Sequence, residues 1–179
     1  MKKIFTFILC ASVFITNAFT QDTLSLKIKE PDFPFEPMYL DSNYSLVDLP
    51  LEKYDITTKS GVGKANIFYL IKTPKSTFSL SATKTLTLVV KQGLVNGSMT
   101  NVKDIYKLFK VTVNEKKKTR SCLITSAKWT TQSFPDDLPI TYRKVRDDIY
   151  LLIIKNPEPG EYIIEVKVRE AKLYSFSIN

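Results

Sequence analysis

Few residues of this chain have types and spacings that suit catalysis. Two pairs of adjacent carboxylates occur, Asp136-Asp137 and Asp147-Asp148, and glycoside hydrolysis needs two carboxylates about 5 to 9.5 Å apart across a cleft. Adjacent residues of a strand point to opposite faces, so each pair alone is a poor dyad and suits a solvated turn or strand end better. The chain contains no histidine, which removes the Ser-His-Asp and Cys-His arrangements and every imidazole metal site. We therefore predict no catalytic residue.

Thiol and metal chemistry have equally little support. The two cysteines are Cys10 and Cys122; if Cys10 leaves with a signal segment, Cys122 has no partner for an internal disulfide. Cys122 lies in an apolar strand pattern, where a buried and inert thiol is the usual outcome. Asp41-Ser42-Asn43 begins like a calcium loop but lacks the later ligands of an EF-hand. The sequence predicts no metal site and no cofactor.

The densest basic run is formed by Lys116, Lys117 and Lys118, with Arg120 just beyond. Such a run can neutralise the phosphates or sulfates of anionic glycans, lipopolysaccharide or nucleic acid. It can equally be the tip of a hairpin that its charges keep soluble. The net charge of +8 is spread over many predicted strands, as on an ordinary solvated surface. We therefore expect no nucleic-acid partner and keep the three lysines as weak ligand-contact candidates.

Aromatic side chains are the other binding candidates. Trp129, Phe134 and Tyr142 lie near one loop in the sequence and could line a shallow sugar site by stacking. Aromatic residues at alternating strand positions more often belong to a core. We keep these three as candidates for a carbohydrate-binding surface.

The C-terminal segment shows most clearly which elements must position these side chains. An apolar run, Tyr150 to Ile154, is stopped by Asn156 to Gly160, where two prolines fix φ and the glycine can take a positive φ. Apolar and polar residues then alternate strictly. The set predicted to face a core is Tyr162, Ile164, Val166 and Val168, and the set predicted to face water is Glu161, Glu165, Lys167 and Arg169. A last strand, Leu173 to Ile178, alternates again. We predict a three-stranded antiparallel meander with one face in water.

Short strands separated by turns fill the rest of the chain, and helix signals are nearly absent. A first strand is predicted at Thr23 to Glu30, a turn at Asn96-Gly97, and either a helical turn or a loop feeding a strand at Val102 to Phe109. We predict an all-β fold, a two-sheet antiparallel β-sandwich that is immunoglobulin-like in broad architecture, with at most one short helix.

A proline-rich segment precedes most of these strands. Pro31, Pro34 and Pro37 interleave with Phe33 and Phe35, so the backbone must be extended and cannot donate a regular ladder of hydrogen bonds. It is predicted to form an edge or a crossing between sheets, with both phenylalanines packed over the domain. A proline-rich partner motif is the alternative.

The N-terminal segment resembles an export signal. Lys2 and Lys3 precede an apolar run from Ile4 to Ile15, and small residues, Ala18 and Thr20, follow. We expect residues 1–20 to be a cleaved signal peptide, with cleavage after Ala18 as the alternative, and 21–179 to be one sandwich domain. The chain would then have no transmembrane span after signal cleavage and would be periplasmic, on the cell surface or extracellular.

The C-terminal half resembles small secreted β-sandwich proteins of unassigned function from Bacteroidetes-type bacteria. The resemblance rests on the apolar strand Leu151 to Ile154, the Pro-Gly-Glu-Tyr turn at Pro159 to Tyr162 taken as a hairpin, and the aromatic final strand Tyr174 to Ile178. It extends upstream to about Ile67. It implies export and a β-sandwich, and it supplies no catalytic residue.

These observations predict an exported, non-catalytic interaction or structural module of the cell envelope. Its expected partner is an envelope protein or a glycan. The first alternative is a carbohydrate-binding domain that uses Trp129 and nearby aromatic residues. The second alternative is a glycoside-directed hydrolase that uses Asp136 and Asp137.

Overall fold

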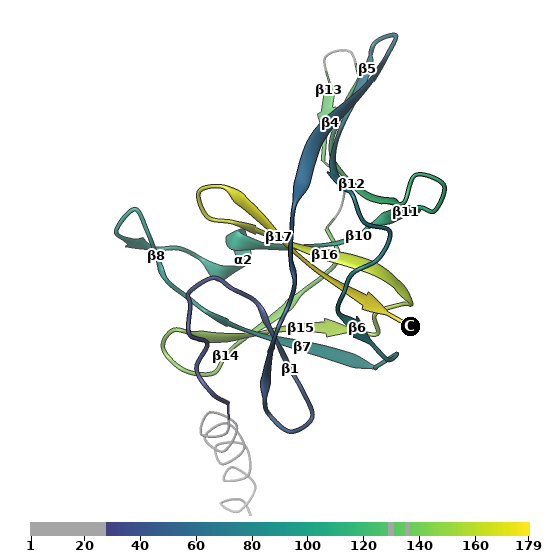
Figure 1. Cartoon of the computed structure of the whole chain (residues 1–179). Coiled ribbons are helices and arrows are strands. Elements are labelled where there is room, and N and C mark those ends of the chain that lie inside the picture. The colour runs from purple at the N-terminus through teal and green to yellow at the C-terminus, as the bar shows by residue number, and fades with distance from the viewer. Residues whose placement is uncertain (1–27, 129–130, 135–136) are drawn as a thin grey trace, which may run out of the picture.

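The computed structural model describes residues 28–128, 131–134 and 137–179, and its elements carry the labels of Figure 1. The expected signal peptide and most of the expected first strand lie outside these residues. Of that strand only Ile28 to Glu30 are described, and they are not in a strand, although Ile28 is buried. None of the described helices is long and apolar enough to cross a membrane.

Two antiparallel sheets form the body of the molecule. Sheet A has the order β14-β15-β7-β1-β2. Its strands are β14 (Thr141–Lys144), β15 (Ile149–Lys155), β7 (Thr85–Lys91), β1 (Met38–Leu40) and β2 (Leu46–Asp48). Sheet B has the order β10-β16-β17-β3, and β6 adds a parallel pair to β17. Its strands are β10 (Tyr106–Lys110), β16 (Gly160–Lys167), β17 (Ala171–Ile178), β3 (Leu51–Glu52) and β6 (Ser79–Leu80).

The main core lies between sheets A and B. Sheet A contributes alternate residues such as Leu86, Leu88 and Leu152, and sheet B contributes Ile164 and Phe176. All five are fully buried, and each such side chain stabilises the fold by about 1.5–3 kcal/mol. The prediction of an all-β, two-sheet antiparallel sandwich, immunoglobulin-like in this broad sense, is confirmed.

One short helix lies in the described residues, at the segment that the sequence left ambiguous. α2 (Val102–Ile105) begins at Asn101, whose side chain accepts a hydrogen bond from the Lys103 N–H at 3.1 Å. It leads directly into β10, so the helical turn and the strand both occur. Before it, β8 (Leu94–Val95) and β9 (Ser98–Met99) pair around the predicted Asn96-Gly97 turn, where both residues have positive φ.

A third sheet, which the sequence did not predict, extends from sheet B. Sheet C has the order β11-β12-β5-β4, with β13 also paired to β12. Its strands are β11 (Thr112–Asn114), β12 (Thr119–Lys128), β5 (Lys64–Ile71), β4 (Tyr54–Gly61) and β13 (Thr131–Ser133). Lys53 alone separates β3 from β4, and Val111 alone separates β10 from β11. Two stretches of chain therefore pass from sheet B into sheet C, and the far half of sheet C projects from the body as an arm (Figure 1).

The base of this arm covers the second face of sheet B with an apolar cluster and a buried ion-pair cluster. Ile163 and Leu173 of sheet B pack with Tyr69 and Ile71 of sheet C. The sequence pattern predicted that Glu161 and Glu165 face water. This prediction is wrong, because both side chains are buried. The Tyr69 hydroxyl donates a hydrogen bond to Glu165 at 2.5 Å, and burial together with this bond raises the pKa of Tyr69.

Arg120 is the centre of the ion-pair cluster. Its side chain has 0% exposure and forms ion pairs with Glu52 at 2.5 Å and Glu161 at 3.2 Å. It also donates to the carbonyl oxygen and the hydroxyl of Thr73, while the Ser177 hydroxyl donates to Glu161. Buried charges need this degree of pairing. The cluster therefore fastens the arm to the body.

The predicted three-stranded meander is also wrong. β16 pairs with β17 as expected, from Gly160↔Ile178 to Lys167↔Ala171. β15, however, pairs with β7 and β14 in sheet A. The turn at Asn156 to Gly160 therefore joins two sheets and is not a hairpin. Its backbone fits the expectation, since Gly160 has φ 150°.

Candidate functional site

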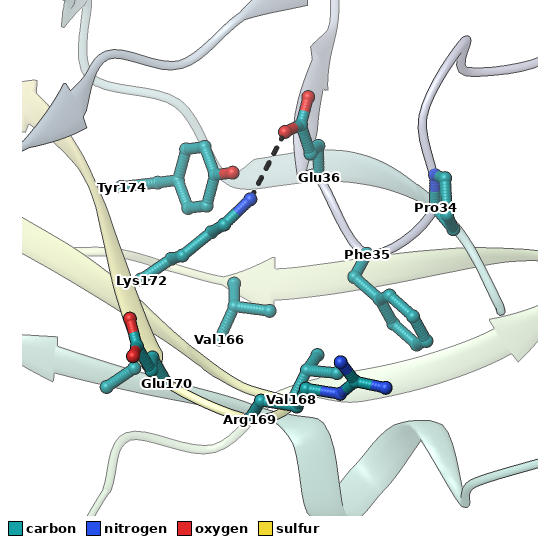
Figure 2. A pocket seen from close by; sticks show the side chains of 10 residues that line it. Pro34, Phe35, Glu36, Val166, Val168, Arg169, Glu170, Lys172 and Tyr174 are labelled. Carbon is teal, nitrogen blue, oxygen red and sulfur yellow. Dashed lines mark ion pairs between the residues drawn. The ribbon is translucent and has the colours of Figure 1, made fainter. Parts of the chain in front are cut away.

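A hollow opens on the body where the chain before β1 faces the turn between β16 and β17. We call it the edge groove, and Figure 2 shows its lining. Residues 34–36 form one wall, and Val166 to Tyr174 contribute the other. Its volume is about 410 Å³, within the range of roughly 300–1,000 Å³ that is usual for small-molecule sites.

The first wall is held in a strained conformation around Phe35. Phe35 has φ 67°, which is unusual for a bulky residue and costs of order 1–3 kcal/mol. Its N–H donates to the Lys91 carbonyl oxygen at 2.8 Å. Gly93 makes room for this arrangement, because a Cβ there would lie 2.8 Å from the Phe35 ring and 2.9 Å from Pro34. The predicted packing is confirmed for Phe35, which is half-buried, and wrong for Phe33, which is 65% exposed.

The second wall combines apolar side chains with one buried hydroxyl. Val166, Val168 and Ala171 line the groove. Tyr174 is 4% exposed, and its hydroxyl makes no hydrogen bond of normal geometry to a described residue. Burial, and secondarily the charge of the nearby Glu36 carboxylate and a hydrogen-bonding interaction with it, raise the pKa of Tyr174 to about 12. Tyr174 therefore stays protonated at neutral pH, with Glu36 as a nearby acceptor.

Charged side chains form the rim of the groove. Lys172 Nζ lies 3.6 Å from Glu36 Oε1, and this ion pair joins the two walls (Figure 2). Both side chains are exposed, so the pair contributes about 0–1 kcal/mol. Arg169 and Glu170 complete the rim, and Arg169 forms no ion pair with a described residue.

The chemical groups of this groove are suited to binding. They are apolar walls, a protonated phenol and charged rim side chains. This arrangement can hold a molecule whose apolar part fills the groove and whose polar part reaches Tyr174 and the rim. Among the described residues there is no group of three histidine, cysteine, aspartate or glutamate side chains that could hold a metal ion.

The sequence-predicted basic run lies elsewhere. Lys116, Lys117 and Lys118 are exposed in the turn between β11 and β12, as expected for a hairpin tip. Arg120 is not part of this surface, because it is buried in the ion-pair cluster. The three lysines are far from the edge groove in sequence and do not line it.

The aromatic candidates are divided between different parts of the fold. Trp129 lies outside the described residues. Phe134 is 67% exposed and lines a smaller cavity of about 140 Å³ at the base of the arm, with Lys107, Lys167 and Glu165. Tyr142 lies on β14 and packs against the main core, and its hydroxyl donates to the Tyr106 carbonyl oxygen at 3.1 Å.

The remaining chemical candidates that the structure describes lie outside the edge groove. Asp136 lies outside the described residues, and Asp137 is exposed. Asp147 is exposed and lies 3.6 Å from Lys144. Cys122 is buried, and burial raises the pKa of its thiol to about 12.

Asp41 and Thr125 both have local structural positions. Asp41 accepts hydrogen bonds from the backbone N–H groups of Asn43 and Ser45, at 2.8 and 2.7 Å, so it closes the β1–β2 turn. In β12 the register shifts between Leu123 and Thr125. Thr125 therefore lies on the buried face with Cys122. Beyond this point in β12, the residues that face the core are no longer those that strict alternation from Cys122 predicts.

Sequence reasoning missed the edge groove because its two walls are far apart in the chain. Phe35 and Tyr174 each follow a local pattern that predicts packing, and nothing local predicts that they face one hollow. The proline spacing around Phe35 and the isolated Gly93 were the available signals.

Comparisons of the chain with protein-family models, with curated proteins and with solved structures found no match. The C-terminal resemblance therefore stays a prediction.

Proposed function

We propose that this chain is an exported, non-catalytic interaction module of the cell envelope that holds an amphipathic anion in the edge groove. One observation carries the proposal. Tyr174 has a protonated hydroxyl that is buried beside an apolar groove and makes no hydrogen bond of normal geometry to a described residue, although the Glu36 carboxylate lies near it. A buried hydroxyl without a good hydrogen bond costs about 1–3 kcal/mol, and a bound acceptor would supply that bond.

Two cations at the rim could meet an anionic head group. Arg169 and Lys172 line the groove beside two carboxylates, Glu36 and Glu170. Arg169 forms no ion pair with a described residue, and the exposed Lys172–Glu36 pair can open at little cost. A carboxylate or phosphate head group would accept from Tyr174 and meet these cations, while a hydrocarbon body would contact Phe35 and Val166. The strain at Phe35 suits a wall that is fixed before the ligand arrives.

The test is a fluorescence titration of the protein with a dansyl-labelled fatty acid. Saturable binding is expected, and Tyr174→Phe, which removes only the hydroxyl, should weaken it about tenfold. Tyr142→Phe is the matched control, because it makes the same change at a tyrosine whose hydroxyl bonds to Tyr106 outside the groove. An absence of saturable binding, or unchanged affinity in Tyr174→Phe, would refute the proposal.

Carbohydrate binding is the second candidate, and the exposed ring of Phe134 favours it. This ring lies beside a cavity that Lys107 and Lys167 also line, and flat aromatic surfaces stack on sugars. Binding on a glycan array that disappears in Phe134→Ala would support this alternative. Unchanged glycan binding in that variant would exclude Phe134 as the platform.

A further inference from the structure

We propose that the free edge of β4 pairs with β4 of a second copy of this chain, so that two copies of sheet C join into one continuous sheet. This inference is independent of the edge groove. It starts from the position of β4, which pairs with β5 on one side and has no paired strand on the other among the described residues. Such an edge presents unpaired N–H and C=O groups that can bond to another strand.

β4 lacks most of the devices that protect edge strands. It is eight residues long, contains no proline and pairs with β5 without a bulge from Tyr54↔Ile71 to Gly61↔Lys64. It lies in the projecting arm (Figure 1). Ile56 on this strand is 64% exposed. A long, regular and partly apolar edge of this kind favours pairing.

Symmetry restricts how two copies of β4 can pair. A two-fold axis normal to an antiparallel sheet keeps each side chain on its own face, and directly opposed residues must share a face. The axis must therefore pass midway between the two copies of a single residue, which then lies opposite itself. The registers near the middle of the strand are therefore centred on Ile56, Thr57 or Thr58. Each of them places a different set of side chains opposite one another.

The charges select one of these registers. Centring on Thr57 places Asp55 opposite Lys59 of the second copy, and Lys59 opposite its Asp55, so two complementary pairs form. Centring on Ile56 would place Lys53 opposite Lys59, which is unfavourable. Centring on Thr58 would pair neither Asp55 nor Lys59 with an opposite charge. The selected register also places Thr57 opposite itself and Ile56 opposite Thr58.

The existing contacts of these side chains allow this pairing. Asp55 forms an exposed ion pair with Lys72 at 2.8 Å, and Lys59 lies over the Phe68 ring at 4.9 Å. Asp55, Thr57 and Lys59 share the face of sheet C opposite Tyr54, which packs into the cluster at the base of the arm. The charged pairs would therefore form on the outer face without disturbing the attachment of the arm.

The first test is sedimentation equilibrium of the full chain over a wide concentration range. Reversible dimerisation is expected. Lys59→Asp replaces two attractive pairs with two repulsive ones and should weaken the dimer roughly thirty-fold. Adding Asp55→Lys to that variant reverses both charges and should restore the dimer. Lys116→Asp is the matched control, since it makes the same charge change in the exposed turn at the other side of sheet C.

The second test reports the register itself. Directly opposed residues have Cα atoms about 4.5–5.5 Å apart, which a disulfide can bridge. In a chain that carries Cys10→Ser, Thr57→Cys should form a disulfide-linked dimer faster than Thr58→Cys, although Thr58 is the more exposed of the two. Random collisions would give the reverse order.

Three results would overturn the proposal. They are a monomer at every concentration, a dimer that Lys59→Asp leaves unchanged, and faster cross-linking at Thr58 than at Thr57. A monomer that captures an extended peptide at β4 would show that another protein occupies the edge.

Discussion

Replacing Arg120 with leucine tests whether the ion-pair cluster fastens the arm to the body. Arg120 is fully buried and pairs with Glu52 at 2.5 Å and Glu161 at 3.2 Å. Leucine would fill part of the space but would leave both carboxylates buried beside an apolar group. Removing one partner of a buried ion pair costs about 3–5 kcal/mol. For a chain of this size, that free energy corresponds to a fall in Tm of about 10 °C.

The assay is urea unfolding, with the free energy of unfolding obtained by linear extrapolation. Adding Glu52→Gln and Glu161→Gln to Arg120→Leu should recover part of the loss, because neutral amides are less costly to bury than unpaired carboxylates. Lys117→Leu, in the neighbouring exposed turn, is the control and should change stability by less than about 0.5 kcal/mol. A loss below about 1 kcal/mol in Arg120→Leu, or no recovery in the triple variant, would refute this account of the cluster.

Three further predictions concern the turn between the sheets and the buried titrating groups. Gly160→Val should lower the free energy of unfolding by about 1–3 kcal/mol, because φ is 150° there, a conformation that residues with a side chain rarely adopt. A variant that melts like wild type would contradict this prediction. Cys122, whose thiol pKa is raised to about 12, should react with an aromatic disulfide reagent at pH 8 only after denaturation, so rapid labelling of the native protein would disprove its burial. The pKa values of Tyr142 and Tyr174 are raised from 10.0 to about 12, so the folded state keeps protons that the unfolded state loses. Stability should therefore fall as pH rises from about 10 to 12, and a flat profile in alkaline urea titrations would be inconsistent with both values.

Local side-chain patterns were enough to predict three strands of the sandwich. β15, β16 and β17 lie where the sequence placed them, and Tyr162 faces the main core as expected. These patterns are local, since residues two positions apart share a face whatever the rest of the chain does.

The sequence failed where the outcome depends on distant partners. Glu161 and Glu165 look solvent-exposed in the sequence because they are charged. They are buried because Arg120 and Tyr69, far away in the chain, pair with them. The same limit applies to the turn before Gly160, since no local signal distinguishes a hairpin from a connection between two packed sheets.

The candidate site was predictable only in its parts. The three prolines around Phe35 indicated an extended segment, and the alternation of Leu173 to Ile178 indicated the strand that carries Tyr174. That these two residues would line one groove depends on how sheet B stacks on sheet A. The unpaired edge of β4 could not be predicted either. A local sequence pattern predicts that a segment is a strand, but it does not predict which strands pair with it.

The position of β17 in sheet B has a consequence for the time at which this chain can fold. β17 pairs with β16, β3 and β6, and its backbone also bonds to Pro50 and Phe78. These partners are all synthesised before β17. Sheet B therefore cannot close while β17 is still being made, and the strands that await it expose apolar faces until then. A nascent chain of this protein should stay open to chaperones until β17 has left the ribosome.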